Sequence, residues 1–187
     1  SIVLLQEKIY KSYESFLRVF SGVPCVVLHQ FSLTCLLDEV KSTNDIEGVQ
    51  STRKEIRNII DGNPESPRLK SIVTKYQNLL AKHPLKFQTA EDIRAFYDDF
   101  AHTEISAENP QNKLDGRLFR KDSVDITSGT GKTIHRGVFP ETEIISALNQ
   151  ALSILNDDTI PFLIRLGIFH YLFAYIHPFY DGNGRTD

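Results

Sequence analysis

Two residue types are absent from this sequence of 187 residues, which contains no Met and no Trp. A natural chain begins with Met and usually contains several more, so the absence leaves two explanations. Either the sequence begins inside a longer chain, or methionines are missing from it and a few residue spacings are compressed. On both grounds we expect the natural protein to be longer than these 187 residues.

Cysteine is scarce, since only Cys25 and Cys35 occur and both lie in apolar stretches. One bridge in a chain of this size is not a disulfide framework, and neither flank has the spacing of metal ligands. The sequence therefore predicts two buried or half-buried thiols in a reducing compartment.

Long apolar runs are missing as well. The longest uncharged stretches are Val19–Leu37 and Leu166–Tyr180, and both are interrupted by Pro and His. Neither is a clean span of about 20 apolar residues, which a membrane helix needs. No charged-then-apolar signal segment opens the sequence. We predict a cytoplasmic protein for which a membrane is not a partner.

The charge balance lacks a strong excess of either sign. Lys and Arg number 21 and Asp and Glu number 24, which gives a net charge of −3. A broadly basic surface for nucleic acid is therefore not indicated, and no nucleic-acid partner is expected. Hydrophobic residues make up 41% and charged residues 24%, values typical of a globular protein.

Helical periodicity is present along most of the chain. The polar run Lys41–Asp45 is predicted to separate the second helix from the third, and Thr89 to begin the fifth. The last helix is apolar almost all round, which favours a central helix enclosed by the others. The predicted helices cover approximately residues 2–20, 30–40, 46–60, 69–80, 90–100, 142–155 and 161–176.

The apolar period changes after Pro110. Apolar and β-branched residues on both sides of residues 128–131, which read Ser-Gly-Thr-Gly, predict a short β-hairpin with a flexible tip. Taken alone, such a hairpin is a plain surface hairpin. The fold class is therefore mainly α, a helical bundle with one short hairpin.

The end of the last helix carries the residues with the most chemistry. His177 can accept a proton, Asp181 is a hard oxygen ligand suited to Mg²⁺, and Arg185 can bind phosphate oxygens. Gly182 and Gly184 allow backbone N–H groups to turn towards one anion. Together these residues predict a site for phosphate-group transfer.

Simpler interpretations exist for each part. The run Asp-Gly-Asn-Gly is a common surface turn, and His177 at a helix end could be a cation on the helix dipole. The compact conjunction of all the parts directly after a buried helix favours the site.

The stretch His177-Pro-Phe179-x-Asp181-Gly-Asn-Gly-Arg185 resembles the signature of the Fic domain, His-x-Phe-x-Asp/Glu-Gly-Asn-Gly-Arg-x-x-Arg. The resemblance extends from near Phe87 to the end of the sequence. It implies a Fic-type helical bundle with a hairpin flap over residues 86–187, and an N-terminal helical extension over residues 1–85.

The resemblance implies transfer of AMP from ATP to a Ser, Thr or Tyr hydroxyl of a target protein. His177 would be the base, Asp181 would hold Mg²⁺, Arg185 would neutralise developing charge, and Phe179 would anchor the loop in the core. The implied partners are ATP and the target protein, and a homodimer is left open. The phosphates would be cradled by Gly182, Asn183 and Gly184.

The hairpin would dock an extended segment of the target by strand addition. The residues expected to do so are Val124, Asp125, Ile126, Thr133 and Ile134.

A second motif, Thr43-x-x-x-Glu47-Gly48, resembles the inhibitory motif of many Fic proteins. In those proteins the glutamate reaches the second arginine of the signature and takes the place of the γ-phosphate. By the resemblance, that arginine falls directly after Asp187, and the helix that begins at the glycines would also be lacking. We therefore expect these 187 residues by themselves to be inactive or impaired.

Other functions remain open for the same fold. It could remove AMP, transfer another phosphate-containing group, or bind nucleotide as a module without catalysis.

Overall fold

The computed structural model describes residues 1–46, 48, 50–62, 73–74, 77–78, 86–99, 105 and 109–186. Within these residues the protein is mainly helical with one two-stranded sheet, so the predicted fold class is confirmed. The elements in chain order are α1 (Ile2–Phe20), α2 (Cys25–Ile46), α3 (Arg53–Ile60), α5 (Ala90–Tyr97), the short 3₁₀ helix η3 (Pro110–Asn112), β1 (Asp125–Thr127), β2 (Thr133–Arg136), α7 (Glu141–Leu155), α8 (Phe162–Ile176) and α9 (Asn183–Thr186).

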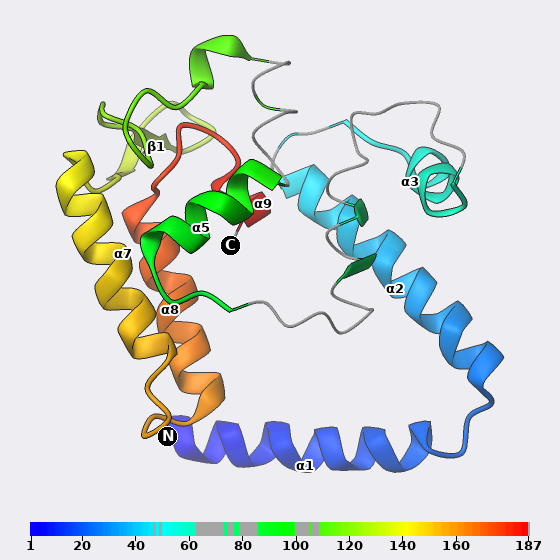
Figure 1. The fold of residues 1–187 in the computed structure, drawn as a ribbon. Coiled ribbons are helices and arrows are strands. Elements are labelled where there is room, and N and C mark those ends of the chain that lie inside the picture. The colour runs from blue at the N-terminus through cyan, green and yellow to red at the C-terminus, as the bar shows by residue number, and fades with distance from the viewer. Residues whose placement is uncertain are drawn as a thin grey trace.

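Helices α7 and α8 form an antiparallel pair, and α5 packs across them (Figure 1). The hairpin lies beyond the end of α8 from which the chain continues into the signature segment. Helix α1 runs along the opposite edge, with the N-terminus beside the connection between α7 and α8 (Figure 1). The larger hydrophobic core of the described residues therefore lies next to the segment from His177 to Arg185.

The described residues form two hydrophobic clusters. One joins α2, α3 and Val73, and the other joins α5, α7, α8 and Phe179. The predicted boundary between residues 85 and 86 falls between the two clusters but stays a prediction. The members of the second cluster are Ala90, Ile93, Tyr97, Ile105, Phe119, Ile144, Leu148, Ala151, Leu152, Phe169, Phe173, Ile176 and Phe179.

The start of α5 agrees with the capping signal in the sequence. Thr89 caps α5, because its side chain accepts the N–H of Asp92 while the Asp92 carboxylate accepts the N–H of Thr89. Helix α1 has the predicted bounds. The helix predicted over residues 69–80 falls largely outside the described residues, where only residues 73–74 and 77–78 are seen as helix.

The predicted break at Lys41–Asp45 is wrong, because α2 continues through this run to Ile46. Lys41 and Asp45 form an ion pair one helical turn apart, and the buried Asn44 donates a hydrogen bond to the Ser51 hydroxyl at 3.0 Å. The next helix begins only after Thr52, whose side chain and that of Glu55 form a capping box.

Two predictions about burial are also wrong. Cys25 and Cys35 are exposed, since the buried face of α2 is made by Leu36, Leu37, Val40 and Asn44. Helix α8 is not enclosed, because only one stripe is buried within the described structure. That stripe consists of Phe169, Phe173 and Ile176.

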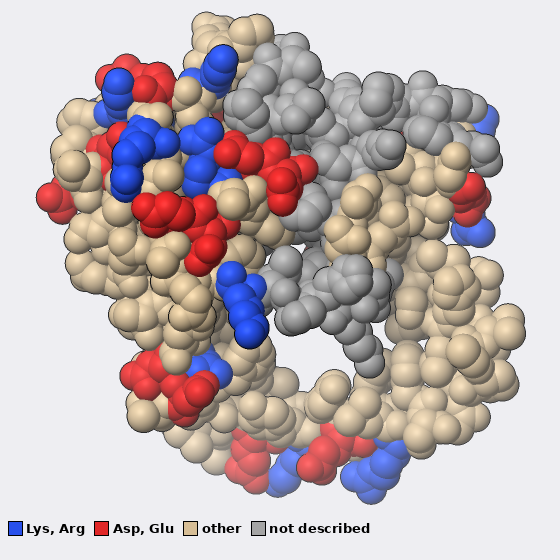
Figure 2. Space-filling view, viewed as in Figure 1, with Lys and Arg blue, Asp and Glu red and all other residues tan. Residues whose placement is uncertain are grey.

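No helix in the described ranges has the length and apolar character needed to cross a bilayer. On the face shown in Figure 2, Lys and Arg side chains are interspersed with Asp and Glu side chains, both around α5 and along the edge formed by α1.

Candidate functional site

His177 ends α8 in a left-handed backbone conformation, with φ of 52° and ψ of 62°. Its N–H donates to the Phe173 carbonyl at 2.9 Å, which satisfies one of the last carbonyls of the helix. The side chain is half-buried, and burial is the main reason why its pKa is lowered below 6.5. A lowered pKa keeps the imidazole neutral near physiological pH, the form that can accept a proton.

Phe179 anchors the segment that follows. Its side chain is fully buried, and its ring stacks on Tyr97 with centroids 3.9 Å apart and an interplanar angle of 12°. The rings of Phe119 and Phe173 lie within 5.5 and 6.5 Å. Phe179 thus ties the loop to α5, to α8 and to the stretch before the hairpin, as an anchoring role requires.

Asn183 closes the loop around Phe179. Its side-chain oxygen accepts the Phe179 N–H at 3.0 Å, and its amide nitrogen donates to the Phe179 carbonyl at 2.9 Å. Asn183 is only 6% exposed, so these bonds replace hydration that burial removes. The side chain therefore holds the loop in shape. The phosphate binding predicted for Asn183 is left to its backbone N–H.

Gly182 turns the chain from the loop into α9. Its φ of 80° lies in the left-handed region, which explains the glycine at this buried position. Its carbonyl accepts the Thr186 N–H at 3.1 Å and the Thr186 hydroxyl at 2.8 Å. The expectation that the helix at the glycines would be lacking is therefore wrong for its first turn, which begins at Asn183. Gly184 is exposed in that turn, and the Arg185 side chain lies outside the described atoms.

Both carboxylate oxygens of Asp181 accept hydrogen bonds. One carboxylate oxygen accepts the Gly182 N–H at 2.6 Å, and the other accepts the Asn112 side-chain amide at 3.3 Å. No local pattern in the sequence points to Asn112, because it lies 69 residues away in η3.

The residues around Asp181 offer a metal ion a single carboxylate side chain within the described structure. Across the described residues, no group of three or more His, Cys, Asp or Glu side chains could hold a metal. One half-buried carboxylate nevertheless fits Mg²⁺, which is usually bound by one or two carboxylates together with substrate phosphates and water. A carboxylate oxygen has two lone pairs, so the hydrogen bonds orient Asp181 and are compatible with a metal ligand.

The hairpin is held against the end of α8. The His135 ring nitrogen Nε2 makes a 2.7 Å hydrogen bond with the Tyr175 carbonyl, and the Val138 N–H donates to the Ile176 carbonyl at 3.0 Å. The structure thus brings the hairpin next to His177, although the two lie some 40 residues apart in the sequence.

The two strands pair antiparallel, with Asp125 opposite Arg136 and Ile126 opposite His135. Of the residues predicted to dock a target, Val124 and Ile126 are half-buried. The exposed ones are Asp125, Thr133 and Ile134.

The predicted inhibitory motif is described only in part. Thr43 is half-buried in the last turns of α2, and Gly48 has a φ of 73°. Glu47 lies outside the described residues.

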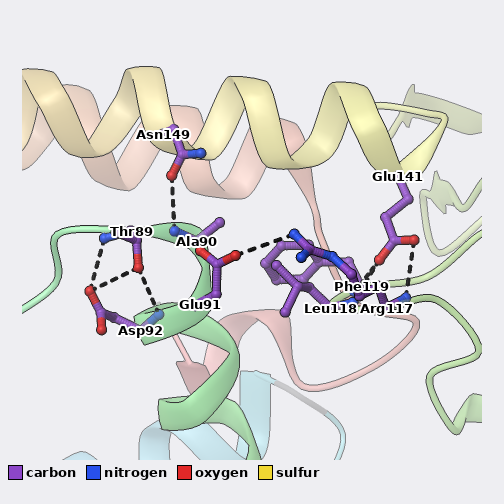
Figure 3. A network of polar contacts seen from close by, with 9 residues as sticks. All are labelled: Thr89, Ala90, Glu91, Asp92, Arg117, Leu118, Phe119, Glu141 and Asn149. Carbon is purple, nitrogen blue, oxygen red and sulfur yellow. Dashed lines mark hydrogen bonds and ion pairs between the residues drawn. The ribbon is translucent and has the colours of Figure 1, made fainter.

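The stretch before the hairpin is held by Glu141 (Figure 3). Its carboxylate accepts the N–H groups of Arg117, Leu118 and Phe119 at 3.1, 2.7 and 3.0 Å. Burial by itself raises the pKa of Glu141, but hydrogen bonds from these three N–H groups outweigh it, and the pKa is lowered.

Figure 3 also shows how α5 joins this network. The Ala90 N–H donates to Asn149 of α7 at 2.9 Å, and Arg117 reaches Glu91 at 3.3 Å.

Replacing Glu141 with glutamine should lower the free energy of unfolding at neutral pH by about 1.5–3 kcal/mol, the range for hydrogen bonds to a charged group. Because the folded-state pKa is lowered, the stabilisation is present above the ordinary glutamate pKa and is lost as the pH falls through the folded value. Urea denaturation at neutral and acidic pH measures both effects. Glu143→Gln, an exposed change in the same turn, is the control. Equal losses in the two variants would refute the role of the network.

The fold and the loop geometry together define a helical core that presents a His, an Asp and a glycine-rich turn at one helix end. The family model described as the Fic/DOC family matches residues 84–187, and the chain belongs to this family.

The structure is also similar to the crystal structure of a Fic family protein from Desulfovibrio desulfuricans G20, determined at 2.70 Å resolution. The TM-score is 0.70 and the sequence identity 23%, over 99% of this chain and 54% of that chain. The chain thus spans about half the length of that protein, and the likeness supports the fold.

Proposed function

We propose that the protein transfers AMP from ATP to a hydroxyl side chain of a target protein. Membership of the Fic/DOC family supports transfer of a nucleotidyl or other phosphate-containing group. The observation that carries the finer proposal is His177, a half-buried imidazole with a lowered pKa at the start of the loop that holds Asp181.

In the proposed reaction the target hydroxyl oxygen attacks the α-phosphorus of ATP. A new O–P bond forms, the bond between the α-phosphorus and the bridging oxygen breaks, and pyrophosphate leaves. The hydroxyl proton passes to a ring nitrogen of His177, which is neutral before the step. No covalent enzyme intermediate is required, so positioning and electrostatics supply the rate enhancement.

The loop after His177 would bind the phosphates. The backbone N–H groups around Gly182 and Gly184 would cradle them, and Arg185 would add a cationic fork. Asp181 would hold Mg²⁺, which when bound neutralises phosphate charge.

The hairpin would present an open strand edge to an extended segment of the target. Its position against the end of α8 supports this role, because a segment added there lies close to His177.

The label position in ATP tests the proposal against its alternatives. The full-length protein is incubated with Mg²⁺ and with ATP labelled on either the α- or the γ-phosphate, and labelled protein is counted. AMP transfer predicts label from the α-phosphate only. Label from the γ-phosphate would support phosphoryl transfer. ATP binding without either label would support a nucleotide-binding module, and release of AMP from modified protein would support the reverse reaction.

We also propose that Glu47 restrains the activity. Glu47→Gly should raise the labelling of target proteins, because removing its carboxylate frees the arginine that would bind the γ-phosphate. Initial rates with α-labelled ATP measure the effect in the full-length protein. Glu39→Gly, the same substitution at an exposed site on α2, is the control. An unchanged rate in Glu47→Gly would refute the restraint.

A further inference from the structure

Arg120 is fully buried, yet its guanidinium donates to backbone carbonyls only, among the contacts seen in the described residues. Nε donates to the His177 carbonyl at 2.9 Å, and Nη1 donates to the Asp122 carbonyl at 2.7 Å. Nη2 donates to the carbonyls of Val138 at 2.8 Å and Ile176 at 3.3 Å. One side chain thereby joins three segments.

Those segments are the end of α8, the residues before β1 and the residues after β2. The last carbonyls of a helix have no partner within the helix, and a cation there is favourable. Arginine suits this place because its planar group presents five donors in fixed directions, whereas a lysine ammonium cannot reach several segments at once.

Gly137 gives Arg120 the space it occupies. A β-carbon at Gly137 would overlap with Nη2 of Arg120 and lie 3.2 Å from both the His177 β-carbon and the Ile176 carbonyl oxygen. The Gly137 backbone thus approaches the end of α8 as closely as a glycine allows, and any side chain there would push Arg120 from its carbonyls.

We propose that Arg120, with Gly137 beside it, is a positioning residue that joins the hairpin and His177 into one rigid unit. A target strand docked on the hairpin is then held at a set distance and angle from the imidazole. The inference rests on the proposed transfer reaction. It adds a residue that fixes the hairpin, and with it the docked target, relative to His177. Arg120 itself contacts neither the nucleotide nor the target hydroxyl.

The proposal differs from a purely stabilising role in its kinetic consequence. Misplacing the base by about 1 Å can cost about 100-fold in rate. In the proposed reaction ATP is bound by the loop beyond Phe179. That loop is held independently of Arg120, by the stacking of Phe179 on Tyr97 and by the hydrogen bonds of Asn183. Loss of Arg120 should therefore lower kcat and leave the KM for ATP nearly unchanged.

The test uses the full-length protein with Arg120→Lys and Gly137→Ala. We expect both to lower kcat for AMP transfer by about 10–100-fold, with the KM for ATP changed by less than about twofold. Gly167→Ala, in α8, is the glycine control, since a β-carbon at Gly167 would meet nothing within 4 Å. Leu148→Ala, a buried change in α7, serves as a variant of lowered stability.

Two results would overturn the proposal. One is a loss of kcat in Gly137→Ala that is no larger than in Leu148→Ala at a temperature where both are folded. The other is a change in the KM for ATP of Arg120→Lys or Gly137→Ala that is as large as the change in kcat.

Hydrogen exchange separates this proposal from the proposed function. If the parent protein transfers no AMP, the function fails while the coupling can still be measured. The amides of Val138 and His177 should then exchange faster in Gly137→Ala than in Gly167→Ala or Leu148→Ala. Equal exchange in all three would contradict the coupling itself.

Discussion

Replacing His177 with alanine should lower AMP transfer to a target protein by about 10²–10⁴-fold, the usual contribution of a positioned acid or base. The imidazole is expected to take the hydroxyl proton as the O–P bond forms. The residues proposed to bind the phosphates follow His177 in the loop, so ATP binding should be kept. Initial rates with α-labelled ATP, beside ATP binding by calorimetry, measure the two effects.

The pH profile adds a second check on His177. Its pKa is lowered mainly by burial and further by the charges of Arg120 and His135, while a backbone hydrogen bond to Ala174 and, to a smaller extent, Asp181 oppose the lowering. Because the base must be neutral, the rate should fall only as the pH drops through this lowered value, below the ordinary 6.5. His170→Ala is the matched control, since His170 lies on the same helix and is exposed. If His177→Ala keeps a rate close to that of His170→Ala, His177 is not the base.

Replacing Phe179 with alanine should lower the free energy of unfolding by about 3–5 kcal/mol, the usual cost of removing a buried aromatic ring. Phe179 is fully buried and contacts three other rings, so the remaining cavity would be lined by side chains from α5 and α8. The same change should abolish transfer, because the loop that carries Asp181 would lose its anchor. Urea denaturation followed by circular dichroism gives the stability, and labelling gives the activity.

Two further variants serve as comparisons for the stability of Phe179→Ala. Phe179→Leu should cost less than alanine, since it keeps part of the buried volume. Phe162→Ala, at the exposed start of α8, should change stability by about 0.5 kcal/mol or less. A loss in Phe179→Ala as small as that in Phe162→Ala would show that the stack on Tyr97 does not hold the loop.

Much of the fold follows from local signals. The periodicity of Ile2–Phe20, the cap at Thr89 and the hairpin after Pro110 each depend on residues a few positions apart, and each agrees with the structure. The polar run at Lys41–Asp45 did not end its helix, because an ion pair across one turn and a buried bond from Asn44 to Ser51 compensate for weak helix propensity.

Burial was predicted less well, because apolar character alone does not tell which face of a helix meets a neighbour. Helix α8 is apolar nearly all round, and only its stripe towards α7 and Phe179 is buried. The same reason explains the exposed Cys25 and Cys35 on α2.

The sequence by itself determined the mainly helical fold, the hairpin and the place of the compact loop from His177 to Arg185, because these depend on neighbours along the chain. Only the tertiary structure decided that Asn112 orients Asp181 and that Arg120 ties the hairpin to His177, across 69 and 57 residues. Buried carbonyls and carboxylates require partners, and any nearby segment can supply them, so their choice is made when the chain packs.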